Sequence, residues 1–163
     1  MMPLVIDGFE SFAHSQYQPL HLNIAVGAES HFTYAFTFAA LRRKGSMTKQ
    51  QKRIRLSLET KFGRPDPKAI EKSIADLVAI AAPGAKQIAI HSDEHPAYPR
   101  AFKRLKGLAI THACTPSKAA RTPWNPLFPV NLMDLLLRHN SSNHKRETIA
   151  FSKRHQSVIE RAA

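Results

Sequence analysis

Three short runs with the residue pattern of β-strands occupy the first 41 residues. Residues 4–12 read LVIDGFESF and are short, apolar and aromatic-rich. Residues 20–26 (LHLNIAV) and 31–41 (HFTYAFTFAAL) alternate apolar and polar side chains, as half-buried strands do. Because the connections are short, with a turn expected around residues 27–30, the three runs predict an antiparallel meander.

The following part of the chain alternates helix and strand patterns. Residues 68–82 carry apolar side chains at helical spacing and end before a Pro-Gly pair. We expect a strand over about 86–91, a helix over 97–107 that stops at Gly107, and a strand over 108–114. The expected order is therefore β-β-β-α-β-α-β in one α/β domain that spans residues 1–163.

A basic segment separates the meander from the alternating part. Residues 42–67 are rich in lysine and arginine and contain few apolar side chains. We interpret them as an exposed basic loop, with a short helix as the alternative. Such a segment is usually a solvated face, but it is also the best candidate in this chain for contacting a phosphate backbone.

Irregular structure and two helices are expected in the last third of the chain. Residues 115–129 are punctuated by proline and predict an irregular insertion, in which Trp124 anchors the segment to the core. Residues 130–139 (VNLMDLLLRH) predict a short buried helix. Residues 141–163 begin with Ser and Asn, which favour a helix cap, and predict a closing helix.

The charge balance indicates a polyanionic partner. Lys and Arg number 24 against 12 acids, which gives a formal net charge of +12. Nucleic acid is the simplest such partner, because basic side chains neutralise phosphates and release counterions. An anionic membrane surface is the competitor, but we identify no basic amphipathic helix and no run long enough to cross a bilayer. With no signal-peptide pattern and one cysteine, we expect a cytoplasmic protein without disulfides or membrane contact.

Three of the 12 acidic residues stand out as candidates for a functional site. Asp7 interrupts an apolar run, and Asp93 follows strand 86–91. If that strand lies parallel to the first, both carboxylates emerge together, and Glu147 on the closing helix adds a third oxygen donor. Clustered carboxylates repel one another and are costly to bury without compensation. The pattern predicts Mg²⁺, or Mn²⁺, as the compensating cation.

Simpler explanations compete at several positions. Asp93 could cap the helix that follows. A polar helix face, or a hydrogen bond to a neighbouring loop, is enough to explain Asp134. Glu147 and Arg154 are seven residues apart and share a helix face. A solvated ion-pair face is the alternative to a role in which Arg154 holds a phosphate beside the metal site.

Three stretches resemble the catalytic domain of DDE transposases, in particular bacterial insertion-sequence transposases and their integrase-like relatives. They are IDGFESF around Asp7, HSDEHPAY around Asp93 and NHKRETIAFSKR around Glu147, and the third is the most specific. The resemblance covers most of the chain from about Val5. It implies a ribonuclease H-like fold, with a mixed five-stranded sheet in the order β-β-β-α-β-α-β-α flanked by helices.

The resemblance also implies an activity and a set of residues. Asp7, Asp93 and Glu147 match the catalytic, metal-binding acids, and Arg154 matches their basic partner. The implied reaction is two-metal-ion cleavage and strand transfer at insertion-sequence ends, with double-stranded DNA of the element ends and of the target as partner. The residues expected to contact DNA are Arg42, Arg43, Lys44, Arg146, Lys153 and Arg154.

Two departures from the DDE pattern leave other functions open. Gly8 follows Asp7 where many relatives carry an acidic or bulkier residue, and no zinc-ribbon or helix-turn-helix region precedes the first strand. We therefore expect a truncated catalytic domain. The alternatives are a non-catalytic nucleic-acid-binding remnant and a different ribonuclease H-like nuclease, and a homodimer is compatible with each.

Overall fold

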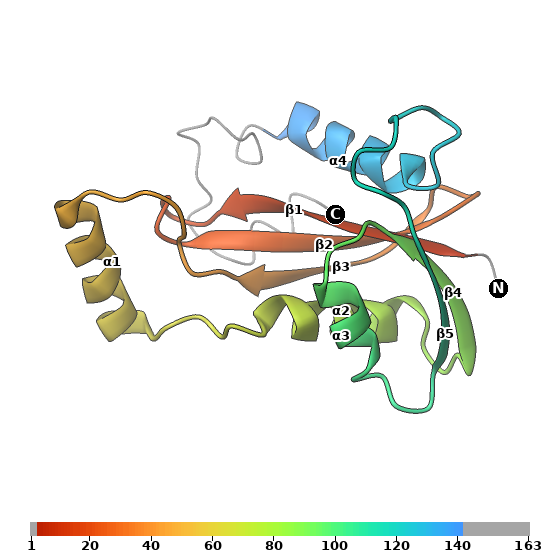
Figure 1. Cartoon of the computed structure of the whole chain (residues 1–163), viewed down its shortest axis with the longest axis horizontal. Coiled ribbons are helices and arrows are strands. Elements are labelled where there is room, and N and C mark those ends of the chain that lie inside the picture. The colour runs from red at the N-terminus through yellow and green to blue at the C-terminus, as the bar shows by residue number, and fades with distance from the viewer. Residues whose placement is uncertain (1–2, 142–163) are drawn as a thin grey trace.

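A single five-stranded sheet forms the centre of the computed structural model, which describes residues 3–141 (Figure 1). The strands are β1 (Leu4–Phe12), β2 (Pro19–Gly27), β3 (Thr33–Ala40), β4 (Gln87–Ser92) and β5 (Ala109–Cys114). Their order across the sheet is β3-β2-β1-β4-β5. The pairs β1–β2 and β2–β3 are antiparallel, whereas β1–β4 and β4–β5 are parallel. This mixed sheet with flanking helices is the ribonuclease H-like fold, and it confirms the expected fold class.

Helices cover both faces of the sheet (Figure 1). Helices α2 (Ala69–Ala81) and α3 (Ala97–Phe102) pack on one face, and α4 (Phe128–Asn140) packs on the other. Strand β2 lies between the two helical layers, and all of its residues except His21 are buried. A strand that is covered on both sides needs apolar residues on both faces, which explains why the alternation in β2 is weak.

The alternation of side chains along β1 divides the core into two parts. Leu4 and Ile6 pack with α2 in one cluster, whereas Val5 and Phe9 pack with α4 in the other. Because successive side chains of a strand point to opposite faces, Asp7 points to the same face as Val5 and Phe9. This parity places a carboxylate of the central strand under α4.

The basic segment 42–67 is not a loop throughout, since it contains the helix α1 (Lys49–Phe62). A capping box begins this helix: Gln51 N donates to Thr48 Oγ1 (3.2 Å), and Thr48 N donates to Gln51 Oε1 (3.0 Å). Gly63, at φ 86°, ends it. The helix buries none of its residues, so local capping rather than an apolar stripe specifies it. The interpretation of the segment as a basic loop is therefore corrected to its stated alternative, a helix.

Two expectations for the last third of the chain are wrong. Trp124 does not anchor the irregular segment, because 91% of its surface is exposed. Helix α4 is not buried all round either: Val130 and Leu137 are buried, but Leu135 and Leu136 face solvent. One apolar stripe is enough to dock a helix on a sheet, and the other leucines lie off that stripe.

Helix α3 is shorter than expected. It ends at Phe102, and the chain reaches Gly107 (φ 84°) through turns. Arg104 N donates to Ala101 O, and Leu105 N donates to Phe102 O, so three-residue spacing replaces helical hydrogen bonding.

The predicted closing helix over residues 141–163 lies almost entirely outside the described residues. None of the helices within residues 3–141 has the length and apolar character needed to cross a membrane.

Candidate active site

Asp7 and Asp93 lie at the same end of two neighbouring strands. Parallel pairing joins Leu4 to Ile90, and the two acids each follow these partners by three residues. Continuing that register places Asp7 and Asp93 at the same level. Both side chains line one cavity of about 50 Å³. The structure thus brings together two of the three acids that the sequence singled out.

Backbone hydrogen bonds orient both carboxylates. Asp7 Oδ1 accepts from Gly8 N at 2.7 Å, and Asp93 Oδ1 accepts from His95 N at 2.9 Å. Helix α3 begins only at Ala97. The residue at its N-cap position is Pro96, whose side chain makes no capping hydrogen bond. Asp93 therefore closes the turn that precedes the helix and does not cap the helix itself.

Asp7 is held in an environment that disfavours its charge. The pKa of Asp7 is raised from 3.8 to about 6, chiefly by burial, and the negative charge of Asp93 acts in the same direction. The hydrogen bond from Gly8 N and the charges of Arg121 and Arg138 act in the opposite direction. Buried carboxylates with such shifts are concentrated at functional sites, although structural networks also produce them.

A third acid, Asp134, adjoins the site. It lies four residues after Val130 and three before Leu137, on the buried stripe of α4. Burial and the charge of Asp7 raise the pKa of Asp134 to about 7. Its Oδ1 is buried and has no hydrogen-bond partner among residues 3–141. The explanation by a polar helix face is therefore wrong. The sequence signal that could have identified Asp134 is its helical spacing from the buried residues Val130 and Leu137.

Two arginines supply positive charge to this region. Arg121 and Arg138 lower the pKa values of both Asp7 and Asp134. The Arg138 guanidinium also lies over the Phe9 ring, at 5.0 Å from its centroid. Arg121 comes from the proline-punctuated segment, which the sequence indicated only as irregular. The compensating charge expected from a cation is therefore provided in part by the protein.

The segment between β5 and α4 walls the small cavity. The remaining lining residues are Pro116, Ser117, Ala119, Arg121, Asn125, Leu127 and Asn131. Asn125 Oδ1 accepts from Leu127 N at 2.8 Å, and Asn125 Nδ2 donates to Ala120 O at 2.8 Å. These hydrogen bonds fold the segment over the strand ends. Sequence reasoning missed these positions, because turn-forming residues show where a chain bends and not what it covers.

A half-buried histidine, His21, lies near Asp93 and His95. The pKa of His21 is lowered to about 4, chiefly by burial and also by the nearby His95, so the His21 imidazole is neutral near pH 7. The partners Asn23 and Asp93 act in the opposite direction. Asn23 is fixed in turn, because its Nδ2 donates to Ser73 Oγ at 2.8 Å.

The donor set fits part of a magnesium site. Asp7 and Asp93 provide carboxylate oxygens at one small cavity, and Mg²⁺ prefers such ligands while retaining several waters. Glu147, the predicted third ligand, lies outside the described residues. Within the described range, no three side chains of His, Cys, Asp or Glu are grouped closely enough to hold a metal ion. This part of the chain therefore supplies two candidate ligands.

The predicted DNA-contacting residues fall into two groups. Arg42, Arg43 and Lys44 follow β3 and line a groove of about 790 Å³. The others, Arg146, Lys153 and Arg154, belong to the part of the chain that the structure does not describe.

Comparisons with known proteins add little to this geometry. No known family model matches the chain, and no curated protein matches it. One solved structure that is similar in shape is the N-terminal RNase H domain of Rv2228c from Mycobacterium tuberculosis, studied as a fusion with maltose binding protein. The match covers 86% of this chain and 100% of that chain, with 12% identity and a TM-score of 0.39. The fold assignment therefore depends on the strand order and strand directions.

Proposed function

We propose that the chain is the catalytic domain of a divalent-metal-dependent DDE transposase, which cleaves and joins DNA strands at insertion-sequence ends. The observation that carries the proposal is the meeting of Asp7 and Asp93 at one cavity, at the ends of parallel strands β1 and β4. The desolvation of Asp7 supports it, because burial without a binding role disfavours a carboxylate. The net charge of +12 supports a nucleic-acid substrate.

The residues divide the work as follows. Asp7 and Asp93 would hold the metal, with Glu147 as third ligand by the resemblance. Bound Mg²⁺ would activate the attacking hydroxyl and stabilise the leaving oxygen at phosphorus. The backbone bonds from Gly8 and His95 fix the two carboxylates before substrate arrives. Arg121, on the same cavity, is suited to bind a phosphate oxygen.

The decisive experiment neutralises the acids one at a time. Asp7→Asn, Asp93→Asn and Glu147→Gln should each reduce Mg²⁺-dependent cleavage of double-stranded DNA by at least 100-fold, while binding to the same DNA persists. Asp76→Asn is the matched control, because Asp76 is exposed on α2 away from the cavity. Equal activity in the Asp7→Asn variant and the control would rule out the proposed site.

A second candidate is a nucleic-acid-binding protein without catalysis. It is favoured by the net charge of +12, which supports binding to a nucleic acid whether or not the acids hold a metal ion. Wild-type protein that binds DNA but cleaves neither DNA nor RNA–DNA hybrid, with Mg²⁺ or Mn²⁺, would support this candidate. Cleavage confined to the hybrid would instead indicate a ribonuclease H-like nuclease.

A further inference from the structure

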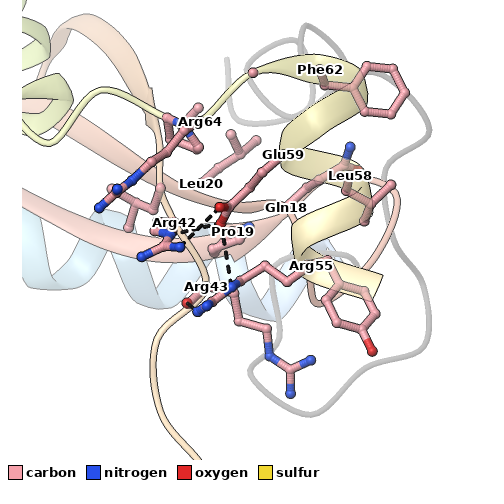
Figure 2. A pocket seen from close by; sticks show the side chains of 15 residues that line it. Gln18, Pro19, Leu20, Arg42, Arg43, Arg55, Leu58, Glu59, Phe62 and Arg64 are labelled. Atoms are coloured by element: carbon pink, nitrogen blue, oxygen red, sulfur yellow. Dashed lines mark hydrogen bonds and ion pairs between the residues drawn. The ribbon is translucent and has the colours of Figure 1, made fainter. Parts of the chain in front are cut away.

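A pocket rich in arginine lies at the far end of the sheet, between α1 and the ends of β2 and β3 (Figure 2). Its volume is about 190 Å³. Four guanidinium groups line it, against a single carboxylate from Glu59. The arginines, hereafter the arginine cluster, are Arg42, Arg43, Arg55 and Arg64.

Glu59 neutralises only part of this charge. It accepts from Arg42 Nε at 2.8 Å and from Arg42 Nη2 at 3.0 Å, in a bidentate pair. Arg55 Nε lies 3.5 Å from Glu59 Oε1. Figure 2 shows Glu59 between these two partners. One carboxylate against four guanidinium groups leaves the pocket with an excess of three positive charges.

Donors in the cluster remain without acceptors. Arg43 Nη1 is buried and has no hydrogen-bond partner within the described part of the chain, and Arg55 Nε forms only the long ion pair to Glu59. Other contacts hold these side chains in place. The Arg43 guanidinium lies 4.7 Å from the Tyr17 ring centroid, and Arg55 Nη1 donates to Arg43 O at 3.3 Å. A buried guanidinium donor without an acceptor is costly, which indicates that an anionic ligand completes the pocket.

A groove extends from the cluster toward the candidate active site, although neither Asp7 nor Asp93 lines it. Arg42 and Arg43 line both the arginine pocket and the 790 Å³ groove. The same groove is lined by Gly8, next to Asp7, and by His95, two residues after Asp93.

The register of β1 and β2 gives the length of this path. Pro19, which lines both the pocket and the groove, pairs with Phe12, five residues along β1 from Asp7. Five residues of strand span roughly 17 Å. At a rise of about 3.4 Å per nucleotide, this distance corresponds to about five nucleotides.

From these relationships we propose that the arginine cluster binds a backbone phosphate of the nucleic-acid strand that enters the Asp7–Asp93 site, about five nucleotides from the reacting position. Planar guanidinium groups match the oxygens of a phosphate in a bidentate geometry that a halide cannot offer. The groove favours a polymer, because it extends from the pocket to Gly8, next to Asp7, and to His95, two residues after Asp93. The register of five nucleotides rests on the proposed function, whereas the phosphate site itself does not.

The first test measures DNA binding by fluorescence anisotropy in EDTA over a range of salt concentrations. The variant R43Q/R64Q removes two charges from the cluster without touching the Arg42–Glu59 pair. The matched control K52Q/R53Q removes two charges from exposed positions of α1 that do not line the pocket. We expect R43Q/R64Q to bind about tenfold more weakly and to lower the salt slope by about 1 to 2. Equal losses in both variants would overturn the proposal.

A second measurement changes the DNA instead of the protein and begins with wild-type protein. Single backbone phosphates of the DNA are replaced by neutral methylphosphonate, one position at a time. Wild-type protein should lose affinity at a position about five nucleotides from the cleaved bond, and R43Q/R64Q should lose nothing further there. If no position weakens binding by wild-type protein while leaving R43Q/R64Q unaffected, a backbone phosphate site is contradicted.

A third arm identifies the source of the phosphate. Titration calorimetry with inorganic phosphate should give no saturable heat at millimolar concentration for wild-type protein. Saturable binding that disappears in R43Q/R64Q, with DNA affinity unchanged, would assign the pocket to free phosphate and reject the proposal. Because binding is measured in EDTA, absence of cleavage would count against the proposed function and not against this site.

Discussion

Gly8 leaves room for the His21 imidazole, since a Cβ atom built on Gly8 would lie 2.5 Å from His21 Nε2. It would also lie 2.5 Å from the carbonyl oxygen of Leu22, in the backbone of the adjacent strand β2. That oxygen cannot move without disturbing the strand pair. The neighbouring strand therefore excludes a larger residue after Asp7, which explains the glycine at position 8.

Replacement of Gly8 by alanine should destabilise the fold. We expect Gly8→Ala to lower the free energy of unfolding by about 1 to 3 kcal/mol, because His21 and the β2 backbone must both shift. Urea denaturation measures the change, and Ser57→Ala on the exposed face of α1 is the control. Adding His21→Ala should restore only part of the loss, since the Leu22 carbonyl remains. Wild-type stability in Gly8→Ala would refute the steric explanation.

Neutralising Asp7 should stabilise the metal-free protein. The folded-state pKa of about 6 lies above the ordinary value of 3.8, so Asp7 contributes stability below pH 3.8 that is lost as the pH rises through about 6. At pH 8 in EDTA, Asp7→Asn should therefore be more stable than wild type by up to about 3 kcal/mol. Urea titrations at pH 5 and pH 8 should show the difference widening with pH. A constant difference would contradict the shifted pKa.

Asp134 should behave in the same way at higher pH. Its pKa of about 7 means that its contribution is lost as the pH rises from about 4 through 7. Asp134→Asn should stabilise the protein at pH 8 by about 2 to 4 kcal/mol and leave it nearly unchanged at pH 4. Because the charge of Asp7 raises the pKa of Asp134, the double variant should gain less than the sum of the two single gains. Thermal or urea unfolding of the four proteins measures this coupling.

Magnesium should stabilise the native protein through Asp7 and Asp93. A ligand present at 100 times its dissociation constant stabilises the native state by about 2.7 kcal/mol. We expect Mg²⁺ or Mn²⁺ to raise the melting temperature of wild type and of Asp76→Asn by several degrees. The variants Asp7→Asn and Asp93→Asn should show no such increase. An equal increase in all four proteins would place the metal elsewhere.

Removal of Trp124 should have little effect on stability. With 91% of its surface exposed, the indole buries almost no area. Trp124→Ala should change the free energy of unfolding by less than about 0.5 kcal/mol. Val130→Ala, at a fully buried position of α4, is the contrasting variant and should cost clearly more. Comparable losses in both would show that Trp124 packs in solution.

The sequence predicted the sheet well because its signals are local. Alternation of side chains, helical spacing and turn residues gave each strand to within two residues of its observed bounds. The proximity of Asp7 and Asp93 also followed, because adjacent parallel strands end at one edge of the sheet. Three features did not follow. Helix α1 is specified by a single capping box and has no buried apolar stripe. The exposure of Trp124 depends on how the irregular segment folds. The place of Asp134 depends on which side of α4 faces the sheet.

Helix α1 buries none of its own side chains, so neither hydrophobic cluster of the domain depends on it. Substitutions along this helix therefore carry little thermodynamic penalty, in contrast to those in α2 or α4. If the arginine cluster binds DNA as proposed, mutations in α1 can alter the position of this contact relative to the Asp7–Asp93 site without destabilising the fold. Sequence changes are therefore expected to be tolerated in this helix more readily than in the sheet.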